Sequence, residues 1–172
     1  QNVATYARYS VFGFTSFVEC FVNSISEDFI ARNPRLPTDK CELLRGKKGG
    51  RYLAVEKKLE VFPEIIRTDG KRPIVLSDPN QISEPYRSFV SHVKDVRDAS
   101  AHFAEHKADI IVPPQAWEKR AQEASTVCLA VARGFGTACY PSRSLPLYLG
   151  KLDDAKHKQI AELRVKTETE EM

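Results

Sequence analysis

A short segment of the sequence carries an arginine, an acid and a histidine close together: Arg97, Asp98 and His102. A histidine can take or give a proton near neutral pH, and arginine offers a planar, always charged fork that suits phosphate oxygens. Asp98 and His102 are four residues apart, so on a helix the carboxylate can hydrogen-bond the imidazole and orient it. These residue types indicate acid–base chemistry beside a phosphate.

The flanking sequence predicts that this segment is part of a helix running from about residue 85 to residue 106. At about 100° per residue, Arg97 and His102 point roughly 140° apart around that helix. One helix alone therefore does not easily aim both side chains at one small target. The prediction of a helix rests on four apolar residues at steps of four, three and seven, which is the spacing of one helix face: Phe89, Val93, Val96 and Phe103.

The order of arginine, polar residue, three spacers and histidine resembles the R-x4–6-H signature of the HEPN superfamily. That resemblance implies a small all-α domain, and many members of the superfamily are metal-independent endoribonucleases. In the family, the position after the arginine is commonly Asn, Asp or His, and Asp98 fits. The resemblance also implies that two protomers pair so that both motifs line one cleft, where an arginine and a histidine from different chains can converge.

RNA cleavage without a metal or cofactor requires proton transfers at the 2′-hydroxyl and the 5′-oxygen and stabilisation of the phosphorane charge. His102 would transfer the protons, which is worth roughly 10²–10⁴-fold in rate. Arg97 would stabilise the charge, and Asp98 would assist as the third catalytic residue. The expected products carry 2′,3′-cyclic phosphate ends.

Weaker signals suggest contacts to RNA outside the catalytic residues. Ser100 lies near the same predicted surface, although an exposed helix serine is the simpler interpretation. Residues 45 to 51 form a predicted flexible loop with four positive charges, among them Lys47, Lys48 and Arg51. A solvated loop is the default interpretation of that loop, and an electrostatic arm that touches phosphates is the alternative. The formal net charge of the whole chain is only +3, so no global basic field demands nucleic acid.

Two further interpretations of the motif compete with catalysis. His102 and His106 stand at i,i+4, a spacing that can share a zinc ion, with Asp98 and Asp109 as further ligands. Alternatively, Arg97 and His102 are surface or salt-bridged residues with no catalytic role. The cysteines add no strong metal signal, because none forms a C-x-x-C pair, and we expect them to be reduced and mostly buried: Cys20, Cys41, Cys128 and Cys139.

The expected fold class is all-α, an antiparallel up-and-down bundle of four main helices plus a short C-terminal helix. Residues 1 to 172 are predicted to form a single domain, with residues 142 to 172 as a loop and C-terminal extension. The first helix also carries apolar residues off its main stripe, which predicts a second covered side, from a neighbouring helix or a second subunit: Phe12, Phe17 and Val22. The main helices are expected at about residues 3–30, 51–66, 85–106 and 114–138, and the short one at 153–165.

The sequence predicts a cytoplasmic protein, because its longest apolar run has six residues and no signal peptide is recognisable. Two functions follow as hypotheses. The first is an endoribonuclease that acts as a toxin or effector in a prokaryotic toxin–antitoxin or phage-defence system, with a nucleotidyltransferase-type antitoxin as one candidate partner. The alternative is a non-catalytic helical dimerisation module that binds RNA, a nucleotide or a protein partner.

Overall fold

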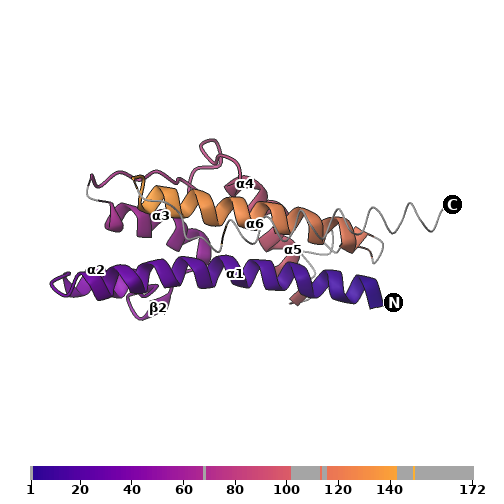
Figure 1. The fold of residues 1–172 in the computed structure, drawn as a ribbon, viewed down its shortest axis with the longest axis horizontal. Coiled ribbons are helices and arrows are strands. Elements are labelled where there is room, and N and C mark those ends of the chain that lie inside the picture. The colour runs from indigo at the N-terminus through magenta and orange to yellow at the C-terminus, as the bar shows by residue number, and fades with distance from the viewer. Residues whose placement is uncertain (1, 68, 102–112, 114–115, 143–148, 150–172) are drawn as a thin grey trace. The chain divides into compact units, whose positions relative to one another are not determined.

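A computed structural model of the chain describes residues 2–67, 69–101, 113, 116–142 and 149 (Figure 1). The chain divides into two compact units, Gln1–Ser142 and Arg143–Met172, and the helices and strands named here belong to the first. This unit is mostly helical with one small sheet, which confirms the predicted all-α character. The helical segments are α1 Asn2–Arg32, α2 Thr38–Leu44, α3 Val55–Ile66, α4 Tyr86–Ser88, η1 Phe89–Lys94, α5 Asp95–Ala101 and α6 Trp117–Cys139.

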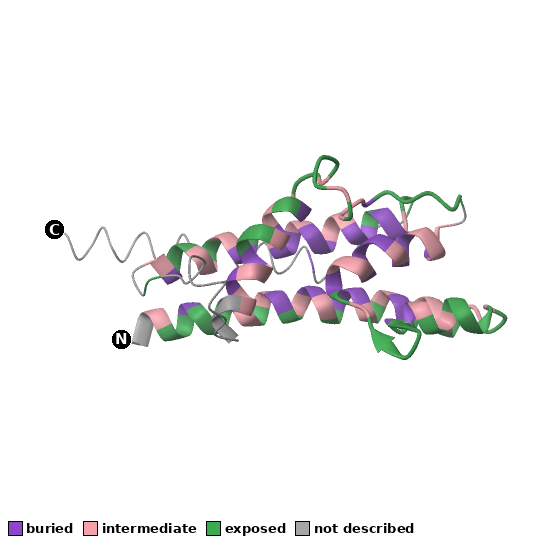
Figure 2. Cartoon of the chain, turned by 180° about the vertical axis from the view of Figure 1, so that it is seen from behind, coloured by how far each residue is buried: buried purple, intermediate pink, exposed green. Residues whose placement is uncertain are grey.

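The two long helices α1 and α6 lie side by side and form the centre of the packing (Figures 1 and 2). The rings of Phe21 and Phe135 meet edge to face at 6.5 Å between centroids. Around them the core is closed by small and branched apolar side chains, which are almost completely buried: Val11, Val18, Val22, Cys128, Val131 and Ala132. Val22 is thus buried as predicted, whereas Phe12 and Phe17 are only half-buried.

Helices α1 and α6 begin at the same end of this unit and run in the same direction (Figure 1). In a strict up-and-down bundle of four helices, the first and the fourth run in opposite directions. The parallel direction of α1 and α6 therefore differs from the predicted up-and-down topology. Helix α3 is much shorter than α1, because its 12 residues span about 18 Å and the 31 residues of α1 span about 46 Å. It does not return the chain along α1: Arg67, directly after α3, donates to the Ala138 carbonyl near the end of α6, so α3 ends where α6 ends.

The helix that carries Arg97 differs from the single α-helix that the sequence predicts. It consists of α4, a π-helical stretch η1 and α5 in direct succession, and the N–H of Asp95 donates to the carbonyl of Val90, five residues back. Such π segments occur frequently at functional sites. The predicted apolar stripe is confirmed for the residues described, because Phe89, Val93 and Val96 are buried. The fourth member, Phe103, lies outside the described residues.

The irregular connection between α3 and α4 is fixed by a buried carboxylate. Glu60 accepts hydrogen bonds from the backbone N–H groups of Leu76 and Ser77, both at 2.7 Å, and from the Lys57 ammonium at 2.9 Å. Burial alone would raise the pKa of Glu60, but these hydrogen bonds outweigh it and lower the pKa from 4.5 to about 2. The Glu60 side chain is 3% exposed, so the connection is held by a charge inside the protein.

The basic segment after α2 is a β-hairpin, so its prediction as a flexible loop is wrong. Strand β1, Lys47–Lys48, pairs antiparallel with β2, Arg51–Tyr52. Gly49 and Gly50 connect the strands with φ of +56° and +76°, the left-handed conformation that a tight two-residue hairpin turn requires. The alternating apolar residues that usually signal a strand are missing, because the side chains of both strands are exposed.

Gly46 sets the base of the hairpin. Its φ is +72°, its carbonyl accepts the N–H of Leu53 at 2.7 Å, and a β-carbon built on it would lie 2.8 Å from Cε of Lys58. Lys58 has little room to move, because its ammonium donates to Glu19 and Asn23 of α1, both at 3.1 Å. The hairpin base, α3 and α1 are therefore packed through one buried lysine.

We expect Gly46→Ala to lower the free energy of unfolding by about 1–3 kcal/mol, because alanine would meet both an unfavourable φ and the Lys58 stem. Urea unfolding followed by circular dichroism measures the change. Gly49→Ala is the matched control, since its φ is also positive but a β-carbon there meets nothing within 4 Å. Equal losses for the two variants would show that the Lys58 contact adds nothing.

Candidate functional site

The Arg97 side chain belongs to a chain of four charged groups that joins α3, η1 and α5. The Arg97 guanidinium donates to one Asp98 oxygen at 2.7 Å, and the Lys94 ammonium donates to the other at 3.1 Å. The same ammonium also reaches Glu56 of α3 at 2.8 Å. All four side chains are between 17% and 25% exposed, so this charge network is largely shielded from water.

The network contains two cations and two carboxylates, and its geometry favours the charged forms of Asp98 and Lys94. Burial would raise the pKa of Asp98, but the hydrogen bond from Lys94 and the charge of Arg97 lower it below its usual value. Burial would likewise lower the pKa of Lys94, and the hydrogen bonds to Glu56 and Asp98 raise it instead. At neutral pH the four formal charges cancel.

Two polar atoms of this network are buried without a hydrogen-bond partner among the described residues: Nε of Arg97 and Oε2 of Glu56. A buried polar atom without a partner is costly. Arg97 is thus oriented by Asp98, while one of its donor groups and one acceptor of Glu56 stay unused within the described part. A phosphate that binds Arg97 would share the guanidinium with Asp98.

The structure places Arg97 and Asp98 in contact but does not test the predicted pairing of Asp98 with His102. His102 lies outside the described residues, and the side chain of Ser100 is not described, so the Asp98–His102 hydrogen bond remains a prediction. The residues that sequence analysis missed are Lys94 and Glu56. Lys94 stands four residues before Asp98, which is the same local signal that paired Asp98 with His102.

The zinc interpretation depends on residues beyond the described range. His102, His106 and Asp109 lie outside it, and the residues that are described contain no group of three His, Cys, Asp or Glu side chains that could hold a metal ion. All four cysteines are free thiols, but only Cys128 and Cys139 are buried, whereas Cys41 is partly exposed and Cys20 is exposed, so the prediction of burial holds for two of the four. Burial raises the pKa of Cys128 to about 12 and that of Cys139 further, so these two thiols are unreactive, as expected for core cysteines.

The predicted RNA-contacting cations Lys47, Lys48 and Arg51 all lie on the β1–β2 hairpin and are exposed. Their aromatic neighbour Tyr52, which is 78% exposed, was not among the residues predicted from the sequence. The Lys47 ammonium lies over this ring, 5.6 Å from its centroid. The sequence feature that could have indicated Tyr52 is its position directly after the basic residues 45 to 51.

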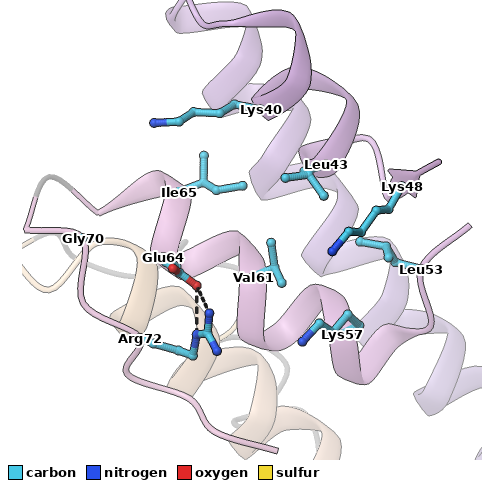
Figure 3. A pocket seen from close by; sticks show the side chains of 10 residues that line it. All are labelled: Lys40, Leu43, Lys48, Leu53, Lys57, Val61, Glu64, Ile65, Gly70 and Arg72. Atoms are coloured by element: carbon cyan, nitrogen blue, oxygen red, sulfur yellow. Dashed lines mark hydrogen bonds and ion pairs between the residues drawn. The ribbon is translucent and has the colours of Figure 1, made fainter. Parts of the chain in front are cut away.

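A groove of about 410 Å³ lies between α2, α3 and the hairpin (Figure 3). Its floor is apolar and half-exposed, and consists of Leu43, Leu53, Val61 and Ile65. Its polar rim carries four cations and one acid: Lys40, Lys48, Lys57, Arg72 and Glu64.

The rim of the groove has a net positive charge. Arg72 pairs with Glu64 at 2.6 Å, and Lys57 pairs with Glu60 at 2.9 Å. Within the described part of the chain, Lys40 and Lys48 form no ion pair. Lys57 lines the groove and its neighbour Glu56 joins the Arg97 network, so the first turn of α3 separates these two charged regions.

Comparison of the chain with models of known protein families, with curated proteins and with solved structures finds no match. Across the described ranges, no helix is both long enough and apolar enough to cross a membrane.

Proposed function

We propose that this protein is a metal-independent endoribonuclease of the HEPN type. The observation that supports this most directly is the position of Arg97. It lies on a helix beside a π-helical segment, its guanidinium is oriented by Asp98 and remains a quarter exposed, and His102 follows five residues later in the sequence. An arginine held in this way is preorganised for a phosphate without first being ordered by it.

In the proposed mechanism, His102 accepts the proton of the 2′-hydroxyl or donates a proton to the leaving 5′-oxygen. Arg97 stabilises the negative charge that develops on the phosphorane. Asp98 positions Arg97 and keeps its own negative charge, because its lowered pKa leaves it ionised at neutral pH. The attack of the 2′-oxygen on phosphorus breaks the bond to the 5′-oxygen and leaves a 2′,3′-cyclic phosphate.

The proposal includes a two-fold dimer in which each cleft takes Arg97 from one chain and His102 from the other. The half-buried rings of Phe12 and Phe17 on α1 support it, because a second subunit would cover them. Helices α1 and α3, the continuous α4–η1–α5 helix and α6 would be the four helices of the bundle. We place the protein in the cytoplasm, as a toxin or effector of a prokaryotic toxin–antitoxin or phage-defence system, with a nucleotidyltransferase-type antitoxin as partner.

The test is cleavage of a mixed-sequence single-stranded RNA by the purified protein in excess chelator. We expect fragments with 2′,3′-cyclic phosphate ends, identified by mass spectrometry, and His102→Ala should lower the rate by about 10²–10⁴-fold. His92→Ala is the matched control, since His92 is an exposed histidine on η1. Intact RNA after incubation with the folded wild-type protein, or equal rates for the two variants, would refute the proposal.

A second candidate function, a non-catalytic RNA-binding module, is favoured by the ion pair at Arg97. Asp98 and Glu56 neutralise the two cations of the motif region, whereas Lys40, Lys48 and Arg51, on the hairpin and the groove rim, form no ion pair within the described part. RNA binding without any cleavage in the same experiment would support this alternative.

A further inference from the structure

The β1–β2 hairpin combines cations and an exposed aromatic ring in one rigid unit. Between Glu42 and Glu56 the sequence contains four cations and no acid. Directly opposed residues of an antiparallel pair project from the same face. Lys47 and Tyr52 are opposed, and so are Lys48 and Arg51. One face of the hairpin therefore carries the Tyr52 ring and one cation, and the other face carries two cations.

The hairpin is anchored to the rest of the protein. The Leu53 N–H to Gly46 carbonyl hydrogen bond closes its base, and the buried Lys58 stem packs beneath Gly46. Lys58 connects this base to Glu19 and Asn23 of α1. The Tyr52 ring is thus held in an exposed position by a fixed support. Little further conformational entropy is therefore lost when a ligand binds to the ring.

We propose that Tyr52 is a base-stacking residue and that the hairpin binds single-stranded RNA. The inference rests on the proposed function, because it names the substrate class as single-stranded. An exposed aromatic ring among cations is the combination that such sites use, since every unpaired base has a flat face to stack and a phosphate to neutralise. A duplex presents no free base face to Tyr52.

The groove beneath the hairpin extends this site. Lys48 projects from the hairpin into the groove rim, where Lys40 of α2 is a further unpaired cation among the described residues (Figure 3). A strand whose base stacks on Tyr52 would pass around the hairpin to Lys48 and Arg51 on its other face, with its phosphates toward this rim. The apolar floor suits an acidic amphipathic peptide too, but such a peptide would not require the exposed aromatic ring on the hairpin.

The test is fluorescence anisotropy with a labelled 2′-O-methyl oligouridine of about 12 nucleotides, a length within known single-strand site sizes. This probe lacks the 2′-hydroxyl and cannot be cleaved, so wild-type protein can be used. We expect Tyr52→Ala to weaken binding about tenfold and Tyr52→Phe to leave it nearly unchanged, because phenylalanine keeps the ring. Lys48→Ala and Arg51→Ala should each reduce the slope of log K against log salt by about 0.7 per lost phosphate contact.

Tyr9→Ala is the matched control, since Tyr9 is 66% exposed on α1 and lies outside the hairpin. A duplex of the same length should bind more weakly and should not respond to Tyr52→Ala. The inference is overturned if Tyr52→Ala and Tyr9→Ala behave alike, or if the duplex binds as tightly. It is also overturned if an oligoglutamate peptide binds as tightly as the oligouridine and Tyr52→Ala has no effect on either, which would reveal a general polyanion surface.

Binding and cleavage separate this inference from the proposed function. Tyr52-dependent binding of the oligouridine without cleavage of ordinary RNA would support the hairpin site and refute the nuclease. Cleavage that depends on His102 but not on Tyr52 would support the nuclease and refute the hairpin site. If both hold, Tyr52→Ala should raise KM about tenfold with kcat nearly unchanged, because the ring binds substrate away from the reacting phosphate.

Discussion

Arg97→Ala should reduce the RNA cleavage rate by about 10²–10³-fold, the loss typical of removing one transition-state charge donor. The variant should stay folded, because Asp98 keeps its hydrogen bond from Lys94 and the apolar face of the helix is unchanged. Single-turnover cleavage measures the rate, and thermal unfolding followed by circular dichroism measures stability. Arg87→Ala is the control, since Arg87 is an exposed arginine of α4 whose side chain bonds only the Ile82 carbonyl among its described contacts. A large fall in melting temperature for Arg97→Ala would show a structural role.

The dimer adds a second expectation for the same residue. Mixing inactive Arg97→Ala with inactive His102→Ala should recover up to about a quarter of the wild-type activity. Half of the randomly assembled dimers would be mixed, and one of the two sites in each would be complete. A mixture that stays inactive although light scattering shows exchanging dimers would contradict a shared site. Cleavage by a strictly monomeric protein would contradict it as well.

Glu60→Gln should lower the free energy of unfolding at pH 7 by about 2–3 kcal/mol. The lowering of the Glu60 pKa from 4.5 to about 2 corresponds to about 3 kcal/mol of stability. Glutamine can still accept the N–H groups of Leu76 and Ser77, but it loses the charge that holds them and the Lys57 ammonium. For a chain of 172 residues the melting temperature should fall by about 4–12 °C.

The pH dependence of the free energy of unfolding tests whether the charge of Glu60 causes this loss of stability. Because the pKa of Glu60 is lower in the folded protein, its contribution is complete above about pH 4.5 and is lost as the pH falls toward 2. The stability gap between wild type and Glu60→Gln should therefore be constant from pH 7 to pH 5 and close below it. Glu64→Gln is the matched control on the same helix, since the exposed Glu64–Arg72 pair should be worth less than about 1 kcal/mol. A gap that does not change down to pH 3 would contradict this account.

The sequence alone determined the features that depend on short-range spacing. The steps between Phe89, Val93 and Val96 predicted the buried face of the motif helix, and the apolar stripes of α1 and α6 predicted two long core helices. The absence of a long apolar run and the ordinary composition agreed with a helical protein that has its own core. These patterns are visible in sequence because helix geometry repeats every 3.6 residues.

The tertiary structure decided which distant groups meet. The structure pairs Asp98 with Lys94, whose ammonium also reaches Glu56 on another helix. Glu60 has the sequence pattern of an ordinary helix acid and becomes a buried anchor only because residues 76 and 77 fold back over it. Helices α1 and α6 run in the same direction, which no local pattern of the sequence specifies. These contacts join segments far apart in the chain, and packing rather than local spacing selects them.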